Sequence, residues 1–178
     1  LPRRPSAIVH LGVAGGLRDG LVAGDAMLCA HAHSGDETID CAAEERLAGL
    51  LACPRSGGCV TVDAVAGTPR AKRALAARYP DALVVEMETF WAARKTRSLG
   101  VPSAFVRVVI DAVDDALPDL SPALDSAGRP RPLAMLKHLA TRPKAIRQLP
   151  KLASAFSRAQ NTIAELIGRV TSTPNANR

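Results

Sequence analysis

Short β-branched runs alternate with stretches of helical spacing along the first two thirds of the chain. The pattern predicts strands over residues 6–11, 26–33, 60–65, 82–85 and 103–110, and helices over residues 39–52, 69–79 and 87–99. Between the first two strands, the sequence GVAGGL (12–17) predicts a glycine-rich bend. Strands that alternate with helices favour a parallel or mixed sheet covered on both faces, so we expect a three-layer α/β/α fold.

The pattern changes after Pro118. Residues 121–132, SPALDSAGRPRP, are typical of a linker, and two further helices are predicted, with Pro143 and Pro150 near their starts. The last of these carries an apolar stripe beside basic residues. We therefore divide the chain into an α/β core (1–120), a basic helical extension (121–170) and a disordered tail (171–178).

Composition narrows the classes of protein that fit. Apolar residues make up 47% of the 178 residues but aromatic residues only 3%, which favours an α/β core built from Ala, Val, Leu and Ile. The net charge of +6 comes from residues 133–170, while the scarcity of aromatic side chains argues against nucleic-acid binding. The four cysteines form no CxxC pair, which indicates buried thiols in a reducing cytoplasm.

Carboxylates stand at the ends of two predicted strands. Glu86, Met87 and Glu88 lie at a strand-to-helix junction, and Asp111 ends the run VRVVI. Because a carboxylate is costly to bury without a purpose, these residues predict a crevice that holds sugar hydroxyls and transfers a proton. Two alternatives stay open: Asp111 as a helix N-cap, and Met87 as ordinary core packing.

Three linked motifs carry a family resemblance. GVAGGL with the following Gly24-Asp25, then VEMET (85–89), then VRVVIDAVDD (106–115) resemble the purine nucleoside phosphorylase and nucleosidase superfamily over residues 8–118. The methylthioadenosine/S-adenosylhomocysteine nucleosidases are the nearest well-known branch. The segment from IDAVDDALP through the C-terminal helices is similar to the hopanoid-associated phosphorylases, which are thought to remove adenine from adenosylhopane. By this resemblance, an N-terminal part that carries the water-activating Glu is missing here.

The resemblance assigns roles to the carboxylates. It implies that Asp111 protonates the purine N7, that Glu88 binds the ribose 2′- and 3′-hydroxyls, and that Met87 lies against the sugar. Glu86 is expected to act as a support for the site or as the partner of Arg107.

The resemblance also marks the residues around the ligand. Ala14 and Gly15 are expected where the backbone approaches it, and Val65 and Ala66 where the base is enclosed, in a pocket made roomier by the valine. The family commonly has Ser at position 13 and, in many phosphorylases, a phosphate-binding Arg at the position that the resemblance assigns to His10. Val13 and His10 therefore favour hydrolysis over phosphorolysis, or else a phosphate that is bound by other groups.

The second predicted strand carries three candidate metal ligands. Cys29, His31 and His33 alternate there, so they are expected to share one face, and such a trio suits zinc. No fourth ligand stands at a helpful spacing and the family needs no metal, so packing at a strand edge is preferred. We predict no metal and no cofactor, with inorganic phosphate as an optional co-substrate.

The sequence thus predicts an enzyme that cleaves the N-glycosidic bond of an adenosyl compound, with adenosylhopane as the preferred substrate. The alternatives are a methylthioadenosine/S-adenosylhomocysteine nucleosidase or another purine nucleoside phosphorylase, and a truncated nucleoside-binding domain without activity. The expected partner is an adenosyl-bearing small molecule or lipid. We expect a cytoplasmic homo-oligomer. Its basic C-terminal helix is expected to contact a membrane surface, or to dock its apolar stripe on the enzyme's own sheet or on a neighbouring subunit, and the two arrangements are compatible.

Overall fold

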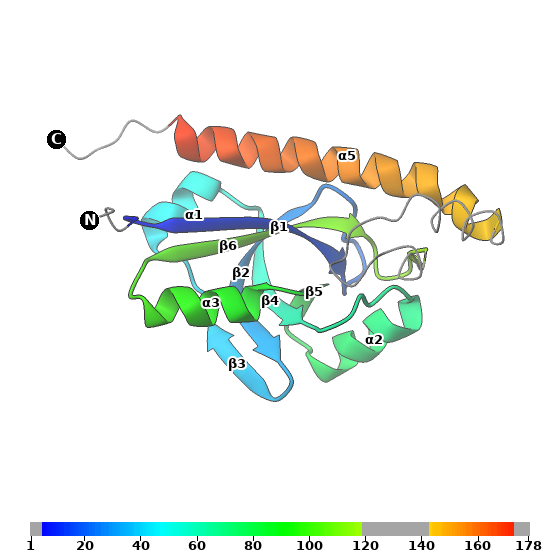
Figure 1. Cartoon of the computed structure of the whole chain (residues 1–178), viewed down its shortest axis with the longest axis horizontal. Coiled ribbons are helices and arrows are strands. Elements are labelled where there is room, and N and C mark those ends of the chain that lie inside the picture. Colours follow the sequence, from blue (N-terminus) through cyan, green and yellow to red (C-terminus); the bar gives the residue numbers. More distant parts are fainter. Residues whose placement is uncertain (1–4, 119–142, 173–178) are drawn as a thin grey trace, which may run out of the picture.

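The computed structural model describes residues 5–118 and 143–172 (Figure 1). The strands are β1 (Ile8–Gly16), β2 (Ala26–Ser34), β3 (Glu37–Asp40), β4 (Arg55–Thr61), β5 (Ala82–Glu86) and β6 (Ser103–Asp111). The helices are α1 (Glu45–Leu51), α2 (Pro69–Arg78), α3 (Thr89–Ser98) and α5 (Pro143–Thr171).

The strands form one mixed sheet in the order β3-β2-β4-β5-β1-β6. The pairs β1–β6, β2–β4 and β4–β5 are parallel, whereas β1–β5 and β2–β3 are antiparallel. The end strand β6 also pairs with β2, so the sheet curls back on itself. This confirms the predicted α/β fold with a mixed sheet. The curl brings the ends of β4, β5, β6 and β1 together, which positions the site described below.

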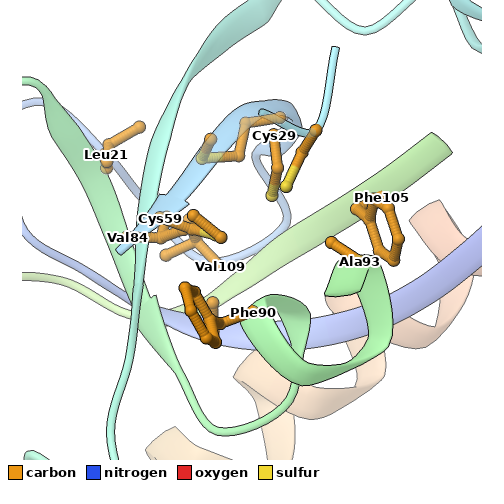
Figure 2. Close-up of a cluster of buried hydrophobic side chains, with 12 residues drawn as sticks. Leu21, Cys29, Cys59, Val84, Phe90, Ala93, Phe105 and Val109 are labelled. Atoms are coloured by element: carbon orange, nitrogen blue, oxygen red, sulfur yellow. The ribbon is translucent and has the colours of Figure 1, made fainter. Parts of the chain in front are cut away.

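Small and β-branched side chains fill the core, as the low aromatic content requires. Figure 2 shows Phe90 of α3 close to Cys59, Val84 and Val109 of the sheet, and Ala93 of the same helix beside Phe105. All six are almost fully buried. Burial of this apolar surface holds α3 on the sheet and fixes where that helix begins, directly after Glu88.

The C-terminal segment forms one helix instead of the two predicted. Pro150 lies inside α5 and is exposed, so the helix tolerates the loss of one backbone hydrogen bond on its outer side. Ala159 and Leu166 are buried against Val106 and Val108 of β6. The apolar stripe therefore packs on the sheet, the second of the two expected arrangements. Within the described ranges, no helix is long and apolar enough to cross a membrane.

Three predicted boundaries are wrong. Residues 12–16 continue β1, because this segment pairs with β6 as far as Gly15, with an irregularity at Ala14/Gly15. The predicted helix 39–52 starts only at Glu45, since residues 37–40 pair with β2 in a hairpin. The strand expected at 60–65 runs over 55–61, because RSGG, which has no strand-like pattern, is paired with the neighbouring β2.

Parts of the predicted domain division lie outside the described residues. These are the linker 121–132, the segment up to 142 and the tail from 173 onward. The division into a core and an extension stays a prediction, although α5 packs directly on the core sheet.

Candidate active site

A cavity of about 520 Å³ opens where β1, β5 and β6 end and where the loops after β4 and β6 meet. All eight residues that the sequence nominated line this cavity: Ala14, Gly15, Val65, Ala66, Glu86, Met87, Glu88 and Asp111. Asp111 and Glu88 therefore face one shared space, although they lie on different elements. The roles assigned to these residues stay predictions.

Glu86 is a buried carboxylate with a full set of donors. Its Oε2 accepts hydrogen bonds from the backbone N–H groups of Glu88 (2.9 Å) and Thr89 (2.8 Å), which caps the start of α3. Nε of the buried Arg107 donates to the same oxygen at 3.0 Å, and Thr61 donates to Oε1. Burial alone would raise the pKa of Glu86, but the charge of Arg107 and these hydrogen bonds hold it below the ordinary value. This geometry favours the supporting role and the pairing with Arg107.

Asp111 is also buried, but it has far fewer donors. Its Oδ2 accepts a hydrogen bond from Nζ of Lys72 in α2, and no described residue bonds to Oδ1. Burial raises the pKa of Asp111 and outweighs the opposing effect of the Lys72 ammonium, while nearby Asp115 raises it further. No helix follows Asp111 within residues 112–118, so it is not a helix N-cap there. A buried carboxyl with a raised pKa and one unbonded oxygen is suited to donate a proton.

Lys72 is the residue that sequence reasoning missed. Its side chain is fully buried, and Nζ also donates to the carbonyl oxygens of Ala112 (2.7 Å) and Asp115 (2.9 Å). The three acceptors match the three donors of an ammonium group. A signal was present in the sequence, since Lys72 shares helical spacing with the packed residues Leu75, Ala76 and Tyr79.

Glu88 lies at the mouth of the cavity with its side chain 69% exposed. Its described ionic partner is His10, with Nε2 at 3.8 Å from Oε2. Arg107 Nη1 donates to Nδ1 of His10 at 3.0 Å, which places the proton of the neutral ring on Nε2, toward Glu88. Burial and then Arg107 lower the pKa of His10, although Glu88 and Glu86 oppose them. A neutral His10 therefore faces Glu88 with its N–H group, at a distance too long for a direct hydrogen bond.

Two apolar side chains line the open side of the cavity. Met87 is 46% exposed and Val65 is 66% exposed, so neither is packed in the core. For Met87 this excludes the alternative of ordinary core packing. Apolar side chains that stay exposed beside a cavity are suited to cover an apolar part of a ligand.

The glycines of β1 serve close packing against β6. A Cβ at Gly12 would lie 2.9 Å from Nη1 of Arg107, and one at Gly15 would lie 3.2 Å from Oδ2 of Asp111. These glycines therefore let the backbone of β1 come close to the buried side chains of Arg107 and Asp111, in addition to the predicted approach to the ligand.

The described residues that line the cavity include two glutamates and one aspartate, but no Lys, Arg or His. The nearby cations, Arg107 and Lys72, are each engaged by a carboxylate. The described lining can therefore bind hydroxyl groups and deliver a proton, but it provides no positively charged side chain for an anion such as phosphate.

Comparison with protein families decides the relationship. The model of the phosphorylase superfamily matches residues 3–156, most of the chain. The chain belongs to the phosphorylase superfamily. No curated protein matches this superfamily member.

Solved structures share the fold of this superfamily member. The 5′-methylthioadenosine nucleosidase of Arabidopsis thaliana is 18% identical with a TM-score of 0.60, and the match covers 95% of this chain and 64% of that one. The S. pneumoniae 5′-methylthioadenosine/S-adenosylhomocysteine nucleosidase, bound to a transition-state inhibitor, is 14% identical with a TM-score of 0.60 and coverages of 93% and 70%. The futalosine hydrolase of Helicobacter pylori is 17% identical with a TM-score of 0.54 and coverages of 84% and 68%. The chain thus spans about two thirds of the length of these neighbours.

Proposed function

We propose that this chain cleaves the N-glycosidic bond between adenine and the ribosyl group of an adenosyl compound. One observation carries the proposal: a buried Asp111 with a raised pKa and the exposed carboxylate of Glu88 line the same cavity. The solved neighbours support the same class of reaction, since they are described as nucleosidases or hydrolases of nucleoside compounds.

The proposed reaction begins with a proton held by Asp111. As the C1′–N9 bond breaks, its electron pair moves into the purine, and Asp111 gives its proton to N7 so that neutral adenine leaves. Lys72 stays hydrogen-bonded to Oδ2 and stabilises the carboxylate that results. Glu88 accepts hydrogen bonds from the 2′- and 3′-hydroxyls, and its negative charge favours the positive charge that grows on the ribose.

We propose water as the acceptor of the ribosyl group: its oxygen bonds to C1′ of the ribosyl cation, and the proton that it loses passes through solvent, which reprotonates the Asp111 carboxylate. A phosphate anion would need cationic or strong hydrogen-bond donors, and the described cavity lining holds no Lys, Arg or His. His10, which stands where many phosphorylases have Arg, has Nδ1 engaged by Arg107 and Nε2 turned toward Glu88. The reaction needs no metal or other cofactor.

The proposed substrate is adenosylhopane, whose 5′ substituent is a large hydrocarbon. The likeness of residues 110–160 to hopanoid-associated phosphorylases supports this choice. An opening bordered by exposed Met87 and Val65 provides space for an apolar substituent to leave the cavity. Methylthioadenosine and S-adenosylhomocysteine are the competing substrates, because several solved neighbours are named as nucleosidases of these compounds.

The decisive experiment incubates the chain with adenosylhopane, methylthioadenosine or S-adenosylhomocysteine, with and without phosphate, and separates the products by chromatography. We expect adenine together with a free reducing ribosyl product, unchanged by phosphate. A ribosyl 1-phosphate product would overturn the choice of water. Binding of adenine without cleavage of any of the three compounds would favour the non-catalytic alternative.

Contact with a membrane surface remains part of the proposal, because a hopanoid substrate must be met at a bilayer. Phe156 and Ile167, eleven residues apart on the same side of α5, stay exposed. Flotation with anionic liposomes tests this contact. The double variant Phe156→Ser/Ile167→Ser should lose flotation, whereas Trp91→Ser, an equally exposed control on α3, should retain it. Equal flotation of all three proteins would refute membrane contact through α5.

A further inference from the structure

Two histidines and one aspartate converge at a place that the proposed reaction does not use. Nε2 of His31, Nε2 of His33 and an Oδ atom of Asp81 all lie within 4.8 Å of one another. His31 and His33 come from β2, while Asp81 lies in the turn between α2 and β5, about fifty residues later. None of the three lines the large cavity.

The sequence indicated a different trio. Cys29 was expected on the same face as His31 and His33, but the pairing of β2 with β4 shifts register between Cys29 and His31. One extra residue reverses the alternation of side chains. Cys29 therefore lies in the core beside Cys59, while the two histidines remain partly exposed. Asp81 takes the place of the missing third donor.

Both imidazole rings aim the same nitrogen at one carboxylate oxygen. His33 Nε2 lies 3.1 Å from Oδ2 of Asp81, and His31 Nε2 contacts the same atom. The other nitrogen of His33, Nδ1, is 2.9 Å from Oγ1 of Thr38 on β3. When Nδ1 carries the proton and donates to this hydroxyl, the lone pair of Nε2 is free to bind an ion.

The surrounding residues hold this arrangement in place. The ring of Tyr79 stacks on His33 at 5.1 Å between centroids, and its hydroxyl donates to the carbonyl oxygen of Gly35 at 2.7 Å. A Cβ at Gly58 would lie 2.7 Å from Nε2 of His31 and 3.1 Å from Oδ2 of Asp81. The convergence of the trio therefore requires glycine at position 58.

We propose that His31, His33 and Asp81 bind a divalent transition-metal ion, with zinc as the best match. Two imidazole nitrogens and one carboxylate oxygen form a donor set that Zn²⁺ accepts, and a water molecule completes a tetrahedron. The half-exposed carboxylate of Asp81 leaves a path for the ion. The ion ties the β2–β3 hairpin to the turn before β5, so its role is to stabilise this edge of the sheet, apart from the reaction.

Zinc titration of the untagged, chelator-treated full chain, followed by calorimetry, tests the site. We expect one ion per chain and a higher melting temperature with zinc. His31→Ala, His33→Ala and Asp81→Asn should each lose this binding. Asp36→Asn, which removes a carboxylate of the same hairpin that pairs with Arg78 at 2.8 Å, is the matched control and should bind normally.

Two further measurements separate the possible outcomes. Thr38→Val removes only the hydroxyl beside His33 and should weaken zinc binding about tenfold or more. Cobalt substitution reports the ligand type, because thiolate ligands give an intense near-ultraviolet charge-transfer band that nitrogen and oxygen ligands lack. The absence of stoichiometric binding, a thiolate band, or equal affinity of the wild type and Asp81→Asn would each overturn the proposal and leave the trio as a hydrogen-bonded cluster.

Discussion

The molecule buries one carboxylate at the end of β5 and another at the end of β6, the two strands that flank β1, and their surroundings shift the two pKa values in opposite directions. Glu86 is surrounded by the guanidinium of Arg107, a threonine hydroxyl and two backbone N–H groups, and its pKa is lowered. Asp111 has a single side-chain donor, Lys72, and its pKa is raised by burial. Burial acts on both groups in the same direction, so the number of donors decides the sign. One carboxylate becomes a structural anion and the other a group able to hold a proton.

The largest expected effect comes from Asp111→Asn. The amide keeps the shape of the side chain but has no acidic proton, so adenine release should fall by about 10²–10⁴-fold. Chromatographic measurement of adenine at saturating substrate tests this, with circular dichroism as a check on folding. Adenine release at the wild-type rate would show that Asp111 is not the acid.

Glu86→Gln should act on stability first. It leaves the buried guanidinium of Arg107 without its counter-charge, which costs about 3–5 kcal/mol in the free energy of unfolding. Urea denaturation measures the change. Asp114→Asn is the matched control, because the exposed pair of Asp114 with Arg73 contributes little, and its substitution should shift the midpoint only slightly.

The lowered pKa of Glu86 also predicts how the stability of the fold depends on pH. The unfolded chain binds a proton at Glu86 more tightly than the folded chain, so this carboxylate contributes stability above its ordinary pKa of 4.5. That contribution is lost as the pH falls below 4.5 and through the lower folded value. The stability difference between wild type and Glu86→Gln should therefore shrink in acid. A constant difference from pH 7 to pH 3 would show that the charge of Glu86 is not the cause.

Lys72→Met tests the comparison at Asp111, because it removes the only described side-chain donor to that carboxylate. Lys72 opposes the rise in the pKa of Asp111, so its removal should raise that pKa further and move the basic limb of the pH–rate profile to higher pH. The profile of adenine release between pH 5 and 9 measures the shift. A purely structural Lys72 would change stability and rate but leave the position of the basic limb unchanged.

The smallest effects are expected from substitutions of Gly12 and Gly15 in β1. Gly12→Ala crowds Arg107 and Gly15→Ala crowds Asp111, each at an expected cost of about 1–3 kcal/mol for an overpacked site. The two variants should differ in kind: Gly12→Ala lowers stability more than kcat, and Gly15→Ala lowers kcat more than stability. Melting curves and initial rates of both variants test this. Equal changes in stability and in kcat for the two variants would contradict the distinction between a structural Arg107 and a catalytic Asp111.

The sequence predicted most elements and nominated eight residues that the fold brings to one cavity. Strands with β-branched runs, such as β6, and helices with clear start signals, such as α2, were predicted within a residue or two. The boundary failures fall on β1, where glycines conceal a strand, on β3, part of which is predicted as the start of a helix, and on β4, whose first residues have no strand-like pattern. In all three cases the neighbouring strand supplies the pairing, which no local pattern reveals.

The sequence alone determined which residues stand at strand ends, because the periods of helix and strand are properties of the local backbone. It also placed Glu86, Glu88 and Asp111 at those ends. Only the tertiary structure decided what each carboxylate touches: Lys72 reaches Asp111 across 39 residues, and Asp81 reaches the histidines of β2 across about fifty. Those contacts depend on strand order and register, and they set the burial and donor count that turn one carboxyl group into an anion and another into an acid.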